Sequence, residues 1–272
     1  MTHVTERVPP RQSLRGDRKS RYIGLRRRRI GMRTPRENEA LMSMSIGFIF
    51  MATRQDRTVP QARALIEEAL ALGVANIGFK DVGLPRAALK ELARAIEAGG
   101  AQVFFEVVSL DRDRELASAA AAADFGVDWL LGGVRAGEVA PIASREGILY
   151  APFPGAVVGH PSALLGSIEE IEASARALSA IEGVAGLDLL AYRRSGDVAA
   201  LMRAVVAAVD KPVIVAGSIH DADRIAAVAE SGAAGFTVGS AAIEGAFAPA
   251  CDFAAQIRAI QRAVAEQGDP RR

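Results

Sequence analysis

VIVAGSIHDADRIAAVAESGAAGFTVGSAAIEG, residues 213–245, holds two short apolar runs with one amphipathic helix pattern between them. The runs at 212–216 and 234–238 have the length of buried strands, and residues 221–231 carry apolar side chains at helical spacing. Both runs lead directly into the dipeptide Gly-Ser. A strand, a helix and a second strand in this order predict a crossover connection, and therefore two parallel strands.

The same unit recurs upstream, so that eight units can be counted from Ser45 onward. The strands that we expect cover residues 45–53, 76–79, 102–108, 128–131, 148–152, 186–190, 212–216 and 234–238. Eight such units in about 220 residues is the number that closes a single (βα)8 TIM barrel of α/β class. The alternative is an open doubly wound sheet, but no G-x-G-x-x-G follows the first strand and the Gly-rich turns come late.

Composition excludes several other classes of protein. The chain has 272 residues, half of them hydrophobic, and a formal charge of +1, which is typical of a folded globular protein. Its one cysteine, Cys251, excludes an internal disulfide framework, and no histidines stand at the spacing of a helical metal pair. No stretch approaches the roughly 20 apolar residues of a membrane span. We therefore expect a cytoplasmic protein with no metal and no cofactor.

The charge is distributed unevenly along the chain. Residues 1–40 carry twelve Lys or Arg against four Asp or Glu, including four consecutive Arg at 26–29. We expect residues 1–43 to be a disordered basic extension, followed by a barrel over 44–266 and a tail over 267–272. The extension has three interpretations: an arm for nucleic acid or acidic surfaces, an organelle-targeting segment, or translated sequence upstream of the real start.

Alternation along the expected strands selects the side chains that point into the barrel. In the second strand Ile77 and Phe79 face the helices, which turns Lys80 toward the barrel axis. The same alternation turns Glu106 inward from the third strand and Asp188 from the sixth. Active sites of such barrels lie at the carboxyl ends of the strands, so these three residues are the candidate catalytic groups.

Lysine is scarce here, with four Lys against twenty-nine Arg, and Lys80 ends a strand. A buried lysine acts as a base, an acid or a Schiff-base nucleophile. Neighbouring strands lie about 4.8 Å apart, so we expect Lys80 to contact Glu106. A salt bridge that only stabilises the barrel is the alternative for this pair, and a structural core carboxylate is the alternative for Asp188.

The two Gly-Ser turns indicate a phosphate site. Gly217 with Ser218, and Gly239 with Ser240, follow the seventh and eighth strands directly. Glycine allows the backbone to approach a ligand closely, and serine adds a hydroxyl donor. The loops after strands seven and eight are the usual phosphate cradle of this fold. The alternative is that both are only tight turns between strand and helix.

Residues 213–245 resemble the C-terminal quarter of the ribulose-phosphate-binding barrels, a superfamily of TIM-barrel enzymes with phosphorylated substrates. The resemblance implies that the two Gly-Ser turns hold a substrate phosphate. Lys80 with Glu106 or Asp188 is similar to the acid and base set of N-acylmannosamine-6-phosphate 2-epimerase.

The pieces FKDVGLP and GLDLLAYRRSGD are similar in placement to segments of (5-formylfuran-3-yl)methyl phosphate synthase, a Schiff-base lyase. That family has a second lysine where this chain has Tyr192 and Arg193. We retain Tyr192, Arg193 and His160 as loop residues that contact substrate groups, or as plain surface residues.

These observations predict an enzyme of carbohydrate metabolism that acts on a small phosphorylated sugar or related carbonyl compound. The favoured reaction is proton transfer next to a carbonyl, as in an epimerase or isomerase. The alternatives are a lyase that uses Lys80 as Schiff-base former, and a non-catalytic barrel that binds phosphorylated metabolites. The expected partner is the small substrate, without a membrane and with nucleic acid only through the basic arm; formation of a homo-oligomer stays open.

Overall fold

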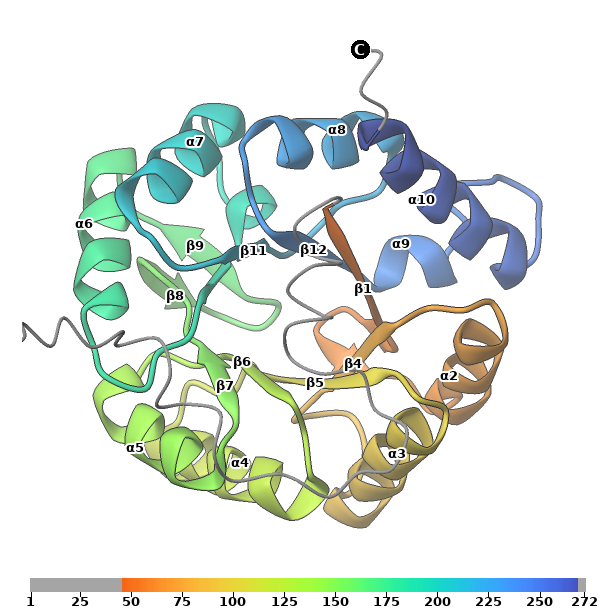
Figure 1. The fold of residues 1–272 in the computed structure, drawn as a ribbon, viewed down its shortest axis with the longest axis horizontal. Coiled ribbons are helices and arrows are strands. Elements are labelled where there is room, and N and C mark those ends of the chain that lie inside the picture. Colours follow the sequence, from red (N-terminus) through yellow and green to blue (C-terminus); the bar gives the residue numbers. More distant parts are fainter. Residues whose placement is uncertain (1–45, 269–272) are drawn as a thin grey trace, which may run out of the picture. The chain divides into compact units, whose positions relative to one another are not determined.

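The computed structural model describes residues 46–268, which belong to one compact unit. The extension expected over residues 1–43 lies outside the described residues, as do residues 269–272 of the expected tail. The described residues form a (βα)8 barrel with the helices in a ring around the strands (Figure 1). The fold prediction is therefore confirmed for this part of the chain.

All eight expected strands are present and all are parallel. They are β1 (Gly47–Met51), β4 (Asn76–Lys80), β5 (Gln102–Val107), β6 (Trp129–Gly132), β7 (Leu149–Ala151), β10 (Leu187–Leu189), β11 (Val213–Val215) and β12 (Gly235–Val238). Their spatial order is β10-β11-β12-β1-β4-β5-β6-β7, so the first strand lies beside the last. The remaining seam lies between β7 and β10. There the backbone carbonyl of Tyr150 in β7 accepts a hydrogen bond at 2.7 Å from the N–H of Ala185, which lies just before β10. The open doubly wound alternative is wrong, because the seam between β7 and β10 is also joined.

Nine α-helices lie within residues 46–268, and all but the short α9 form the outer ring (Figure 1). They are α2 (Ala62–Ala71), α3 (Arg86–Ala98), α4 (Arg112–Phe125), α5 (Ala136–Glu146), α6 (Ile168–Ser179), α7 (Val198–Ala208), α8 (Ala222–Glu230), α9 (Ser240–Ile243) and α10 (Phe253–Gln267). Local sequence defines their starts, since Asp111, Ser167 and Asp221 accept hydrogen bonds from the first turns of α4, α6 and α8. No helix among the described residues is long and apolar enough to cross a membrane.

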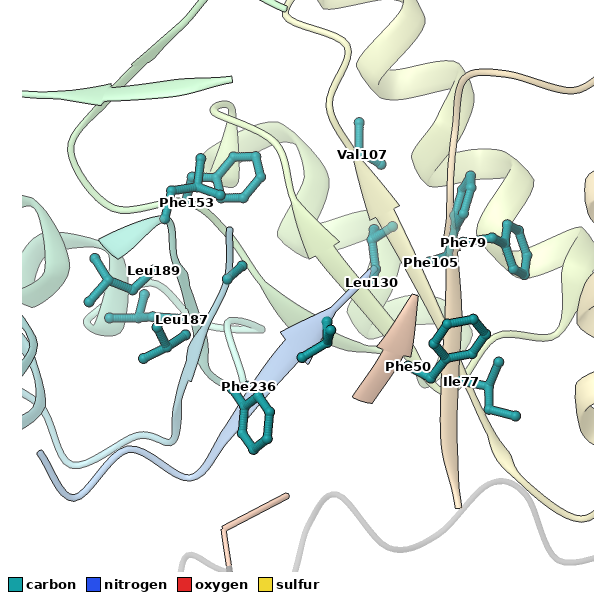
Figure 2. Close-up of a cluster of buried hydrophobic side chains, with 14 of the residues drawn as sticks. Phe50, Ile77, Phe79, Phe105, Val107, Leu130, Phe153, Leu187, Leu189 and Phe236 are labelled. Atoms are coloured by element: carbon teal, nitrogen blue, oxygen red, sulfur yellow. The ribbon is translucent and has the colours of Figure 1, made fainter. Parts of the chain in front are cut away.

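The strands separate two apolar layers. Outward side chains pack against the helices, and Figure 2 shows Phe79 of β4 beside Phe105 of β5, with ring centroids 5.3 Å apart. The inward cluster is smaller and consists of Ile49, Met51, Phe104, Leu131, Ala151 and Ile214. Lys80 is the last residue of β4, and Glu106 is its register partner on β5, so this pair lies at the carboxyl ends of the two strands.

Two hairpins that the sequence analysis did not predict extend from the carboxyl ends of the strands. The first joins β2 (Thr53–Arg54) to β3 (Arg57–Thr58) directly after β1. The second joins β8 (Ala156–Val158) to β9 (Ala163–Leu165) after β7. Val157 and Leu164 of the second hairpin are buried and join the outer core, so this hairpin is packed onto the barrel. Both hairpins supply residues to the site described next.

Candidate active site

Lys80 and Glu106 occupy paired positions at the ends of β4 and β5. The Lys80 Nζ atom lies 3.1 Å from Glu106 Oε1, so the contact expected from the sequence is confirmed. Both residues are buried, with exposed fractions of 7% and 1%. The Thr58 hydroxyl accepts the N–H of Lys80 at 2.9 Å and donates to its carbonyl at 2.8 Å. The backbone that carries the lysine is therefore held from the β2–β3 hairpin.

Asp56, at the turn of the β2–β3 hairpin, is the second acidic neighbour of Lys80. Its Oδ1 atom accepts from Lys80 Nζ at 2.8 Å and from Arg193 Nη2 at 2.9 Å. Its Oδ2 atom accepts the backbone N–H of Ser162, from the turn of the β8–β9 hairpin, at 2.7 Å. One buried carboxylate thus joins its own hairpin to a strand end and to two other loops.

Asp188 lies on β10, between Leu187 and Leu189, which face the helices. It is completely buried, and neither of its carboxyl oxygens has a hydrogen-bond partner among the described residues. Its charge interacts with Glu106, Lys80 and Asp56. The fold therefore brings the three sequence-selected groups into one electrostatic cluster, as strand alternation predicts. Their catalytic role stays a prediction.

Burial and charge act against each other in this cluster. Burial opposes the charged form of Lys80, but Glu106 and then Asp56 outweigh it and raise the pKa of the ammonium group. Burial also opposes ionisation of Asp56, yet the charges of Lys80 and Arg193 lower its pKa to about 2. Burial raises the pKa of Glu106, and Lys80 offsets only part of this effect. Burial, followed by the charge of Glu106, raises the pKa of Asp188 well above its ordinary value.

These directions determine how protons are distributed. Two cations, Lys80 and Arg193, face three carboxyl groups, so full ionisation leaves one uncompensated negative charge in a buried place. One additional proton neutralises the cluster. The raised pKa values of Glu106 and Asp188 direct that proton to this pair. Of the three carboxyl groups, Glu106 and Asp188 therefore take up a proton more readily than Asp56 does.

The two Gly-Ser turns border the same cavity as Lys80 and Glu106, whereas Asp188 does not line this cavity. The cavity measures about 80 Å³, and Gly217, Ser218, Gly239 and Ser240 line it together with Lys80, Glu106, Asp56 and Arg193. A Cβ atom at Gly239 would lie 2.8 Å from the carbonyl oxygen of Thr53, so glycine is required there by packing. Gly217 has φ +85° and lies against the Arg193 side chain. Sequence positions far apart thus form a single cavity.

The three loop residues selected from the sequence are placed differently from one another. Arg193 lines the cavity. Tyr192 is half-buried beside it, but the Arg224 guanidinium covers its ring at 4.6 Å from the ring centroid, and Tyr192 does not line the cavity. His160 is exposed on the β8–β9 turn and does not line the cavity either. The structure therefore brings only Arg193 of these three into the site.

A second cavity of about 300 Å³ lies outside the strands, with Leu89 of α3 and Ala117 of α4 among its lining residues. Phe105 and Phe125 also line it, and neither Lys80 nor Glu106 does. Between residues 46 and 268 no group of three or more His, Cys, Asp or Glu is arranged to hold a metal ion.

Sequence reasoning missed Asp56 and Ser162. Both belong to short hairpins inserted after a strand, where the strand and helix periodicity carries no information. The only local signal is the polar run Arg54 to Arg57 between two threonines, which is typical of a turn. That pattern does not reveal that the Asp56 side chain turns inward.

No model of a known protein family matches the sequence, and no curated protein is similar to it in sequence. Solved structures share its fold. The tryptophan synthase alpha chain from Legionella pneumophila subsp. pneumophila matches 85% of this chain and 95% of its own, with TM-score 0.59 and 16% identity. A solved structure named "Native KDPGal structure" matches 81% of this chain and 94% of its own, with TM-score 0.55 and 16% identity. A chain of the BexX/CysO complex of Amycolatopsis orientalis matches 82% of this chain and 90% of its own, with TM-score 0.55 and 21% identity. At these identities the similarity shows that the chain has the fold of these barrels.

Proposed function

We propose that this protein is an epimerase or isomerase that moves a proton next to the carbonyl group of a small phosphorylated sugar or related compound. One observation carries the proposal: Lys80, Glu106 and Asp56 border the same cavity as the two Gly-Ser turns. Such a cavity offers acid and base groups beside an anion-binding backbone. The resemblance of residues 213–245 to ribulose-phosphate-binding barrels supports the assignment of the turns to phosphate.

The roles follow from the charges. The Lys80 ammonium would stabilise the negative charge that develops on the carbonyl oxygen when the neighbouring C–H bond breaks. The carboxylate of the Glu106 and Asp188 pair would take that proton, and the carboxylic acid would return one to the other face or the neighbouring carbon. Gly217, Ser218, Gly239 and Ser240 would hold the phosphate. Arg193, which lines the cavity, would add a charged hydrogen bond to it.

The alternative is a lyase in which the Lys80 amine forms an imine with the substrate carbonyl. It is supported by the burial of Lys80 at a strand end, because a desolvated lysine is the residue that such chemistry requires. One of the similar barrels is, by its name, a synthase and not an isomerase.

We also propose that the protein is cytoplasmic and that its barrel spans 44–266, although α10 continues to Gln267.

The test begins with phosphorylated sugars and thermal unfolding. A specific ligand at 100 times its Kd stabilises the folded protein by about 2.7 kcal/mol. A stabilising compound is then incubated in deuterated water, and exchange of its hydrogen next to the carbonyl is followed by NMR. Lys80→Ala should abolish this exchange, whereas Lys90→Ala, which alters a lysine paired with Asp124 on the outer helix surface, should not.

Borohydride separates the two chemistries. Under the lyase alternative, reduction in the presence of the ligand leaves a stable mass increment on Lys80. Under the isomerase proposal no adduct forms while deuterium enters the substrate. Normal exchange in the Lys80→Ala variant would exclude both assignments.

A further inference from the structure

Asp56 is the best connected charged group of the site, although it belongs to none of the barrel strands. It contacts Lys80, Arg193 and the backbone of Ser162, and its exposed fraction is 4%. We propose that Asp56 is a positioning residue that keeps Lys80 as a permanent ammonium ion, so that Lys80 enters the reaction as a charge and not as a nucleophilic amine. The second half of this statement rests on the proposed function, whereas the first half concerns the unliganded protein alone.

The surroundings of Lys80 carry the inference. Its Nζ atom lies between two carboxylates, 2.8 Å from Asp56 and 3.1 Å from Glu106. The other charged groups that act on the cluster are Asp188 from β10 and Arg193 from the loop that follows it. Removing the proton from Lys80 would leave two buried carboxylates without their shared cation. The geometry therefore favours the ammonium form far more strongly than a single partner would.

The position of Asp56 is itself specified by the backbone. Gln55 and Asp56 have φ values of 48° and 58°, in the left-handed region that ordinary residues avoid. From this turn the Asp56 carboxylate reaches Lys80 Nζ at 2.8 Å. The Ser162 N–H, contributed by the β8–β9 hairpin, then fixes its second oxygen. Two hairpins thus fix the position of the Asp56 side chain: one carries it and the other donates a hydrogen bond to it.

An imine requires the neutral amine, since only an uncharged nitrogen attacks a carbonyl carbon. An aspartate placed to hold the lysine protonated works against this step. The same aspartate assists a reaction in which negative charge develops beside the ammonium ion, because it holds the cation in place. Asp56 therefore distinguishes the two chemistries that the site residues alone leave open.

The experiment measures the protonation of Lys80 without any substrate. Brief pulses of acetic anhydride between pH 7 and pH 11 label amines in their neutral form, and mass spectrometry reports the extent at each lysine. The pH at half-maximal labelling of Lys80 reports the pKa of its ammonium group, and the plateau reports how readily the reagent reaches the amine. Lys90, which is partly exposed on α3, is the internal control.

Asp56→Asn is the main variant, because asparagine keeps the shape and tolerates a left-handed backbone. Asp56→Gly is the second variant, since glycine adopts the same φ without strain. Glu244→Gln is the matched control, because it removes a carboxylate from the exposed rim beside Arg54. We expect the Lys80 midpoint to fall by about one to three pH units in both Asp56 variants and to stay unchanged in the control.

Equal midpoints in the wild-type protein and both Asp56 variants would overturn the proposal. So would a wild-type midpoint below that of Lys90. These outcomes are independent of phosphate binding, so a failure of the proposed function leaves the labelling result intact. Conversely, a confirmed midpoint shift together with an imine trapped on wild-type Lys80 would refute the charge-only role and retain the positioning role.

Discussion

Glu115 and Asp188 are both buried carboxyl residues, with exposed fractions of 1% and 0%, yet their surroundings are opposite. Glu115 on α4 accepts the backbone N–H groups of Val134 and Arg135 and a hydrogen bond from the Arg135 side chain at 2.7 Å. Asp188 on β10 has no hydrogen-bond partner for either oxygen. The first carboxylate fastens a loop to a helix. The second has unused hydrogen-bonding capacity inside the barrel.

This difference separates a structural acid from a candidate catalytic one. A buried carboxylate whose two oxygens both accept hydrogen bonds offers little to a ligand, because both oxygens already have partners. An unpartnered buried carboxyl costs free energy, and such a cost persists in functional sites where a substrate completes the bonding. The contrast predicts that removing each group has a different consequence.

The largest effect is expected from Glu115→Ala. The substitution leaves two backbone N–H groups and the Arg135 guanidinium without their acceptor, so the folded state should lose about 3 kcal/mol. Thermal unfolding should then occur about 6 to 12 °C lower than in the wild-type protein. Glu138→Gln, which disturbs an exposed pair with Arg112, is the control and should change the midpoint little. An unchanged melting temperature in Glu115→Ala would contradict the structural role assigned to Glu115.

Asp188→Asn should show the reverse behaviour. It removes the proton exchange of the acid while keeping the shape, so turnover of a bound phosphorylated sugar should fall 10²-fold or more. Near neutral pH the stability should rise and not fall, because no hydrogen bond is lost and the cost that raises the pKa of Asp188 is removed. Rate and urea unfolding are measured on the same preparation, with the folded fraction of Glu115→Ala as the comparison. Retained turnover in Asp188→Asn would exclude its catalytic assignment.

The pH dependence of stability should distinguish Asp56 from Asp188. The lowered pKa of Asp56 means that its contribution is present above the ordinary pKa of 3.8 and is lost as the pH falls toward about 2. The wild-type protein should therefore lose roughly 2 kcal/mol over this interval relative to Asp56→Asn.

The raised pKa of Asp188 has the opposite sign. Its contribution is present below the ordinary pKa and is lost as the pH rises through the folded-state value, relative to Asp188→Asn. Urea titrations at a series of pH values give both differences. The difference in unfolding free energy between wild type and variant is plotted against pH for each aspartate. Slopes of equal sign in the two plots would contradict the environments assigned to Asp56 and Asp188.

The smallest effect is expected in the phosphate turns. Ser218→Ala removes one hydroxyl donor from the cavity wall and should weaken binding of inorganic phosphate by about 1 kcal/mol, or about fivefold. Calorimetric titration measures the change, and Ser109→Ala, in the wall of the outer cavity, is the control. Gly239 is a poorer test, because any side chain there would collide with Thr53. Equal affinities in the two serine variants would place phosphate elsewhere.

Strand alternation alone selected Lys80, Glu106 and Asp188, and the structure brings all three into one cluster. This succeeded because a parallel barrel has only two faces, so that one apolar face identifies the other. The same logic does not extend to Tyr192, since the chain leaves the strand after β10 and turns into a short 3₁₀ helix at Ala191–Arg193. Beyond the last strand residue, periodicity no longer indicates direction.

The amino-acid sequence by itself determined the eight alternating units, the inward residues and the two Gly-Ser turns, because these depend on local periodicity and on turn chemistry. Only the tertiary structure decided that Asp56 and Ser162, 106 positions apart, meet over Lys80. It also decided which carboxyl groups are bonded and which are not. Such contacts arise where loops from different units converge, and the electrostatic balance of the site depends on distance through space and on burial, neither of which local sequence encodes.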